Sequence, residues 1–168
     1  MKRIVVFSAL FLLLLPSLSA EPVPTQYYEP AHIGLYLPDD TEIEEEDGVW
    51  YAFSETAEMW VSFEPCETYI PTKKINESLI NEYFADYDIE NFTFLSVMVC
   101  GKVTYGYGQG IVYDEDGEPV EGFFGLLTNN DVPNRTFLFS VVAPTFMVQN
   151  SGEAAQTLLE NIPSAAEY

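Results

Sequence analysis

Basic residues are scarce in this chain, which has six Lys and Arg against 27 Asp and Glu among 168 residues and a formal net charge of −21. Two of the six, Lys2 and Arg3, lie in the first twenty residues, where no acidic residue occurs. A surface this acidic repels phosphate backbones and anionic headgroups. The charge therefore argues against nucleic acid and anionic membranes as partners and leaves open cations, basic proteins and cationic polymers. It is also the surface expected of an exported protein that only has to stay soluble.

Histidine and cysteine, which supply many catalytic bases, nucleophiles and zinc ligands, are scarce as well. His32 is the one imidazole, and no nucleophile motif lies near it in the sequence. With Cys66 and Cys100 it makes three ligands, where structural zinc usually takes four. The sequence therefore predicts no catalytic residue, no cofactor and no metal site. Cys66 and Cys100 are compatible with one disulfide in an exported protein, or with two small buried side chains.

Long hydrophobic runs are absent, since none reaches the ~18 apolar residues that a membrane-spanning helix needs. A shorter run at residues 4–15 follows Lys2 and Arg3, and residues 17–20 (SLSA) end in the small-x-small pattern that signal peptidase accepts. We therefore predict a signal peptide at residues 1–20 and a mature chain that begins near Glu21. No Cys follows the run, which argues against a lipid-anchored form. The expected protein is bacterial and exported, secreted or periplasmic, with no membrane anchor after cleavage.

The aromatic content after residue 20 is too high for a disordered chain and predicts one folded domain over residues 31–166. Residues 21–30 carry three prolines and no periodicity, which predicts an extended lead-in outside the core. Hydrophobic alternation predicts strands, and a period near 3.6 predicts helices. On this basis we expect strands at residues 32–37, 49–53, 59–63, 92–104, 105–114, 118–128 and 135–143, with helices after an Asn76 cap and at residues 151–162. The acidic run at residues 42–47 is assigned no element.

This order of elements predicts an α+β fold in which helices flank a curved antiparallel β-sheet. Taken with that order, the segments LYLPDD, VTYGYGQGIVYD, EPVEGFFGLL and SGEAAQTLLENI resemble the Mog1/PsbP-like fold group over roughly residues 31–163. Proteins of this group typically begin with a strand that ends in Leu-Pro and finish with a helix rich in small residues. The resemblance implies a non-catalytic binding or assembly factor and assigns no functional residue.

Two tryptophans in the expected hairpin are the strongest candidates for recognition. If the loop covers residues 54–58, alternation places Trp50 and Trp60 on one face of the hairpin. The opposite face, which we expect to meet the core, then carries Val49, Tyr51, Phe53, Met59, Val61 and Phe63. Trp50 and Trp60 would either lie beneath a helix or form an exposed pair of the kind that binds sugars and peptides.

Gly106, Gly108 and Gly110 leave one face of an expected strand without side chains. A strip of this kind accommodates the close approach of another part of the chain or of a ligand. The sequence allows two interpretations, in which the strip is packed by the domain's own helix or forms a ligand groove.

The dipeptide Asp116-Gly117 predicts a two-residue turn between the strands before and after it, which would pair Gly108 with Gly125. Asp114, Asp116 and Glu118 give this turn an oxygen-rich appearance, but the residues that complete a calcium loop are missing. We therefore interpret it as a turn.

From these observations we expect a non-catalytic exported binding or assembly module, whose partner is an unidentified protein or glycan. The alternative is an extracytoplasmic hydrolase or its accessory carbohydrate-binding domain. An enzyme should show a cleft in which polar side chains converge, whereas a binding module should show an exposed apolar patch.

Overall fold

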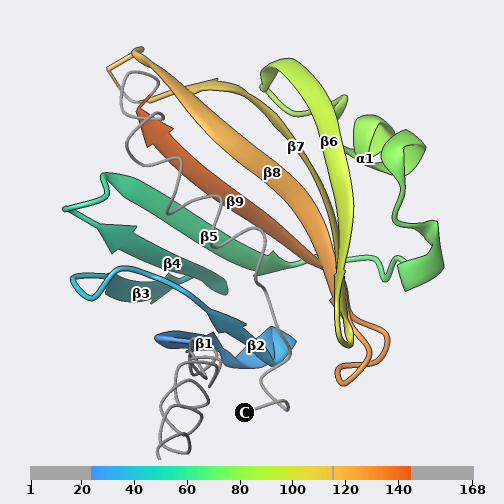
Figure 1. The fold of residues 1–168 in the computed structure, drawn as a ribbon. Helices are drawn as coiled ribbons and strands as arrows, with labels where there is room; N and C mark the ends of the chain where they lie inside the picture. The colour runs from blue at the N-terminus through green and yellow to red at the C-terminus, as the bar shows by residue number, and fades with distance from the viewer. Residues whose placement is uncertain (1–23, 115, 145–168) are drawn as a thin grey trace, which may run out of the picture.

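An antiparallel sheet of seven strands makes up about half of the described chain (Figure 1). The structure, a computed structural model, describes residues 24–114 and 116–144. Across the sheet the strands follow the order β3, β4, β5, β9, β8, β7 and β6. Their bounds are Glu42–Glu46 (β3), Val49–Ser54 (β4), Met59–Pro65 (β5), Glu90–Cys100 (β6), Val103–Tyr113 (β7), Pro119–Asn129 (β8) and Phe137–Pro144 (β9). The expected signal peptide and the expected helix at residues 151–162 lie outside the described residues.

The predicted α+β fold with flanking helices is wrong. The described residues are mostly strand and contain one α-helix, α1 (Glu77–Phe84), with two short 3-10 helices, η1 (Glu29–Ala31) and η2 (Thr72–Lys74). The strands predicted from alternation are present, with ends that differ by a few residues. The acidic run, which was assigned no element, forms the additional strand β3 and is paired along its whole length with β4.

The core on one face of the sheet is completed by a small separate hairpin of β1 (Gln26–Tyr28) and β2 (Ile33–Leu35). Tyr28 is 2% exposed, and its ring stacks on Phe63 at 5.1 Å between centroids. Burial raises the pKa of Tyr28 to about 12. The side-chain amide of Asn129, at the end of β8, donates hydrogen bonds to the carbonyls of Ala31 (3.0 Å) and His32 (2.9 Å) and so holds this hairpin. The prediction that residues 21–30 stay outside the core is therefore wrong for β1.

The opposite face of the sheet is covered in part by α1, which contacts β6 and β7. The predicted cap is confirmed, because the Asn76 side chain accepts a hydrogen bond from the Leu79 backbone N–H at 3.1 Å. Ile80 and Phe84 are buried on the sheet side of the helix. A methyl group added to Gly106 would lie 2.7 Å from the Ile75 side chain and 3.2 Å from that of Ile80. At Gly106, the first of the two interpretations of the glycine strip is confirmed, since the segment that leads into α1 and the helix itself pack there.

Candidate binding surface

The hairpin of β4 and β5 has a four-residue loop, residues 55–58, between the paired residues Ser54 and Met59. The predicted loop was one residue longer. Because side chains alternate along a strand, a difference of one residue reverses the facing of one strand relative to the other. The prediction that Trp50 and Trp60 share a face is therefore wrong. Trp50 pairs with Phe63, whereas Trp60 pairs with Phe53 and lies on the opposite face of the sheet.

The length of this loop is stabilised by Asp40, which precedes β3 in the chain. Its carboxylate accepts hydrogen bonds from the Ser54 hydroxyl (2.9 Å) and from the Thr56 backbone N–H (2.8 Å). These bonds, with those from Thr56 first in importance, lower the pKa of Asp40. The Ser54 oxygen also accepts a hydrogen bond from the Ala57 N–H at 3.1 Å. The loop geometry that sets the register is thus built from polar contacts with a distant segment.

Trp50 is a core residue. It is 8% exposed, and its ring centroid lies 5.7 Å from that of Tyr28 and 5.9 Å from that of Phe63. All three rings belong to the core cluster shared with the β1–β2 hairpin. Trp50 is therefore not available to a partner, and the prediction that it forms part of an exposed pair with Trp60 is wrong.

Trp60, in contrast, is 47% exposed and stacks on Phe53, with 4.8 Å between the ring centroids and 29° between the planes. Tyr51 lies on the same face of β4 as Phe53 and is 44% exposed. We refer to Tyr51, Phe53 and Trp60 as the aromatic platform. Beside it, the hydroxyls of Ser62 and Ser140 are joined at 2.7 Å, which ties β5 to β9.

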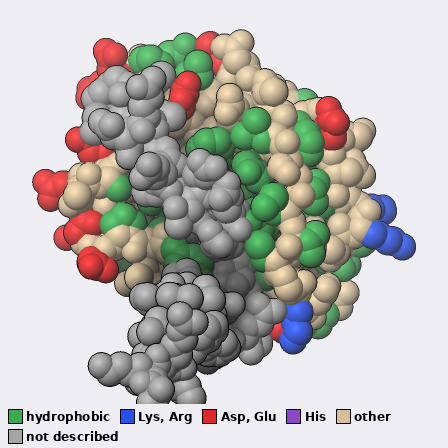
Figure 2. Space-filling view, in the orientation of Figure 1, with side chains coloured by type: hydrophobic (Ala, Val, Ile, Leu, Met, Phe, Trp, Pro, Cys, Tyr) green, Lys and Arg blue, Asp and Glu red, His purple; other side chains and the backbone are tan. Residues whose placement is uncertain are grey.

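β3 is an edge strand of the seven-stranded sheet, and all five of its residues are exposed. Glu42, Glu44 and Glu46 pair with successive outward-facing residues of β4 and therefore lie on the face that carries the aromatic platform. We refer to these three glutamates as the acidic edge. Residues 42–65 contain no Lys or Arg. Figure 2 shows acidic side chains along the side of the molecule where Figure 1 places β3 and β4, and basic side chains toward the other side.

The aromatic platform continues the same sheet face that α1 covers. Trp60 pairs with Val142 of β9, and Val142 packs against the cluster that includes Ile80 and Phe84 of α1. The helix lies beside β6, at the other end of the sheet from β3 (Figure 1). The face is thus packed by the helix at one end and exposes aromatic rings at the other.

Cys66 and Cys100 are not joined in a disulfide, and they pack against different core clusters, one on each face of the sheet. Cys66 packs near α1 and accepts a hydrogen bond from the Tyr83 hydroxyl at 3.5 Å, whereas the Cys100 sulfur lies 3.8 Å from the Tyr105 hydroxyl. Burial raises the pKa of the Cys66 thiol. The structure agrees with the second interpretation, two small partly buried side chains, and not with a disulfide.

The segment between β7 and β8 is a turn, as predicted, but its length differs. The Asp114 carboxylate accepts a hydrogen bond from the Glu118 backbone N–H at 2.8 Å, and three residues separate the two. The ladder then pairs Gly108 with Phe124 and not with Gly125. The predicted two-residue turn is therefore wrong, because the third residue shifts the register by one. Within residues 24–114 and 116–144, no group of three His, Cys, Asp or Glu side chains is arranged to hold a metal ion.

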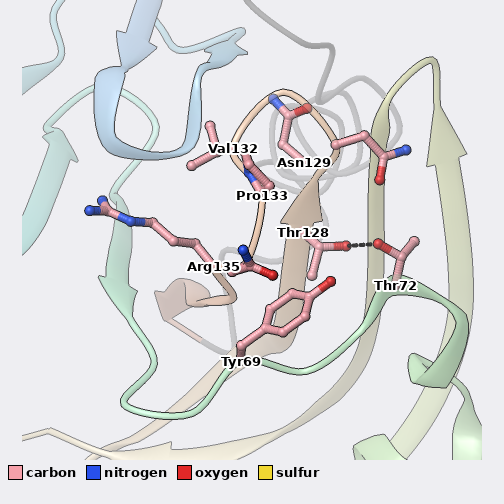
Figure 3. A pocket seen from close by; sticks show the side chains of 9 residues that line it. Tyr69, Thr72, Thr128, Asn129, Val132, Pro133 and Arg135 are labelled. Atoms are coloured by element: carbon pink, nitrogen blue, oxygen red, sulfur yellow. Dashed lines mark hydrogen bonds between the residues drawn. The ribbon is translucent and has the colours of Figure 1, made fainter.

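A small polar cavity lies between the segment that precedes η2 and the end of β8 (Figure 3). Its volume of about 100 Å³ is well below the ~300 Å³ at which small-molecule sites begin. The Tyr69 hydroxyl points toward Thr128, which is hydrogen-bonded to Thr72 at 3.0 Å. The lining consists of Tyr69, Thr72, Thr128, Asn129, Asn130, Val132, Pro133, Asn134 and Arg135. It includes no carboxylate, imidazole or thiol, and His32 lies elsewhere, exposed at the C-cap of η1.

Part of this surface differs from what the sequence predicts. Alternation places Tyr51 and Phe53 on the core side of the hairpin, and no element is expected for the acidic run. The dipeptide Asp47-Gly48 was the available signal, because Asp-Gly is typical of two-residue hairpin turns. Both residues have the positive φ that such a turn requires (52° and 83°), and the residues on either side of them are paired.

No protein-family model and no curated protein sequence matches the chain. Among solved structures, it is similar to LpqN, described as involved in cell envelope biogenesis of Mycobacterium tuberculosis. The match covers 78% of this chain and 82% of LpqN, with 13% sequence identity and a TM-score of 0.45. A likeness this distant assigns neither family nor function, and the resemblance to the Mog1/PsbP-like group stays a prediction. No helix in the described part of the chain is long and apolar enough to cross a membrane.

Proposed function

We propose that the protein is an exported, non-catalytic binding module that contacts its partner through the aromatic platform. The observation that carries the proposal is the exposure of Trp60 next to two further aromatic rings on a regular sheet face. Single exposed apolar residues are normal on protein surfaces, whereas contiguous ones mark sites of interaction. Tryptophan and tyrosine also dominate the binding energy of many interfaces.

The position of the platform on the sheet favours this role further. Tyr51 and Phe53 lie on β4 and Trp60 lies on β5. These two strands are paired with each other and are flanked by β3 on one side and β9 on the other. The Phe53–Trp60 stack fixes the orientation of both rings, and the Ser62–Ser140 hydrogen bond fixes the neighbouring strands. Binding to a surface that is already ordered costs less conformational entropy than binding to a flexible one.

The proposal is tested by placing a benzophenone amino acid at position 51 or 60 in cells that export the protein and irradiating them. We expect discrete crosslinked products from both positions. Val99 supplies the matched control, because it is 68% exposed on β6, which lies at the opposite end of the sheet. Products that form equally at position 99, or no product at 51 and 60, would contradict the proposal.

Export is tested separately from binding. We expect the N-terminus of the protein recovered outside the cytoplasm to begin at or near Glu21, because signal peptidase accepts the preceding small residues. N-terminal mass analysis measures this directly. A secreted form that retains residues 1–20 would contradict the predicted signal peptide. It would not bear on binding by the aromatic platform, which the crosslinking experiment tests.

A further inference from the structure

From the edge position and charge of β3, we infer that the partner is a basic polypeptide segment that pairs in extended form with this strand. The inference rests on the proposed function, since it names the chemistry of the partner that meets the aromatic platform. Extended peptides commonly add to exposed sheet edges, where backbone hydrogen bonds give affinity and alternate side chains give specificity. β3 has a strand partner, β4, on one side, and within the described residues no strand is paired with its other side.

The direction of the β3 side chains sets the pattern that a partner strand must match. Glu42, Glu44 and Glu46 lie on the platform face, whereas Ile43, which is 41% exposed, and Glu45 lie on the other. Residues directly opposite in paired strands are about 4.5–5.5 Å apart at Cβ, close enough for opposite charges to stabilise each other. A partner strand with Lys or Arg at every second position places its charges opposite the three glutamates. Its intervening residues then lie on the side of Ile43 and Glu45, and an apolar side chain is favoured opposite Ile43.

The aromatic platform lies directly behind the acidic edge, as seen from such a partner. Glu42 pairs with Phe53 and Glu44 with Tyr51, so these two glutamates stand between the partner and an aromatic ring, whereas Glu46 pairs with Val49. Long basic side chains that extend over the glutamates approach these rings, and a cation above an aromatic face is attracted to it. Charge and aromatic rings thus act on the same side chains of the partner.

The chain itself is a poor occupant of this edge. Pairing β3 with β3 of a second copy sets glutamates against glutamates, and like charges in opposite positions are destabilising. Residues 145–168, which lie outside the described part, contain no Lys or Arg. The charge of the edge therefore favours a different, basic polypeptide. A neutral glycan could use the aromatic rings, but it carries no charge that complements the three carboxylates.

The test uses a labelled peptide, Lys-Val-Lys-Val-Lys-Val-Lys with blocked termini, and measures its binding to the full mature protein by fluorescence anisotropy. We expect binding that weakens as salt is added. The triple variant Glu42→Gln, Glu44→Gln, Glu46→Gln should bind roughly tenfold more weakly, since three exposed pairs are lost. A control triple variant, Glu77→Gln, Glu82→Gln and Asp86→Asn, changes the net charge equally at α1 and the turn after it, and it should bind as the unaltered protein does.

Three further peptides separate strand pairing from attraction by charge alone. One has the same composition with its lysines in a block, and it should bind more weakly because alternation is lost. The other two carry N-methyl groups on alternate residues, one peptide on its lysines and the other on its valines. Only one of these two patterns removes the N–H groups that face β3, so only one should abolish binding.

The inference is overturned if the alternating peptide fails to bind, or if the block peptide and both methylated peptides bind equally well. It is also overturned if cellohexaose or chitohexaose binds in a way that Trp60→Ala abolishes and the acidic-edge variant does not change. A dimer in sedimentation that the acidic-edge variant strengthens or removes would assign the edge to a second copy. Crosslinks from positions 51 and 60 that persist when the peptide fails would retain the proposed function and reject only the basic strand.

Discussion

The two tryptophans offer the sharpest test of the structure, because they were expected to behave alike and the register separates them. We consider Trp50→Ala and Trp60→Ala as single variants. Trp50 is 8% exposed among core rings, whereas Trp60 is 47% exposed and stacks mainly on Phe53. The first change removes a buried side chain and leaves a cavity, while the second removes one surface stack.

The expected losses of stability differ accordingly. A buried Trp→Ala change costs about 3–5 kcal/mol, because lost burial and the cavity add. Loss of an aromatic stack costs about 0.5–1.5 kcal/mol. With a urea slope of about 2 kcal/mol per M, the unfolding midpoint falls by about 2 M for Trp50→Ala and by about 0.5 M for Trp60→Ala. The first loss is a large share of the ~5–15 kcal/mol that stabilises a typical domain.

Far-ultraviolet circular dichroism is the suitable readout, because each variant lacks one of the two tryptophans and fluorescence amplitudes would not be comparable. Acrylamide quenching supplies a second measurement. It should reach Trp60 in Trp50→Phe far more readily than Trp50 in Trp60→Phe, and a neutral quencher avoids repulsion by the acidic surface. Equal midpoint shifts, or equal quenching of the two residues, would refute the register and the argument built on it.

Three other predictions follow from the packing and the titratable groups. Gly106→Ala should lower stability by about 1–3 kcal/mol in urea unfolding, since the added methyl would lie 2.7 Å from the Ile75 side chain. The free energy of unfolding should fall as pH rises from 10 through about 12, because Tyr28 keeps its proton in the folded state while the unfolded chain loses it. Urea midpoints measured across this range should show a smaller decrease in Tyr28→Phe. Thiol titration of the denatured, unreduced protein should find two thiols, since no disulfide joins Cys66 and Cys100. A count of zero would show that the two are joined in a disulfide.

Local structure was predictable wherever one segment contained its own signal. Asn76 could be recognised as a cap because its side chain bonds to a backbone N–H only three residues away. The long strand β7 could be recognised because small or polar residues alternate with larger ones along much of it, and β6, β8 and β9 because they are rich in apolar residues. The glycine strip on β7 allowed two interpretations, because a bare strand face is filled by close packing or left as a groove, and at Gly106 it is filled by packing.

Register was not predictable, because it depends on loop lengths, and polar side-chain contacts that hydrophobic patterning does not show stabilise those loops. At residues 55–58 the loop is stabilised by Asp40, which hydrogen-bonds to Ser54 and Thr56 from outside the hairpin. At the turn after β7, the side chain of Asp114 accepts a hydrogen bond across a three-residue loop. In both hairpins the predicted loop differed from the observed one by one residue, and one residue moves every side chain of a strand to the other face. The candidate site depends on that choice, since it decides whether Trp50 or Tyr51 is exposed.

β3 shows why hydrophobic patterning alone missed the other half of the surface. Glutamate has a low strand propensity, and four of the five residues of β3 are glutamates, so the composition argued against a strand. At a sheet edge exposed on both faces, however, a strand has little to bury and needs only a turn that holds it against its neighbour. Asp47-Gly48 provides that turn, and the backbone pairing with β4 holds β3 in the sheet. The same glutamates oppose pairing with another copy of β3, which is how exposed edges commonly avoid aggregation. The edge strand β3 is therefore specified by a turn and by its charge. The glutamates that disfavour pairing with a second copy of β3 are the same ones that a basic strand would complement.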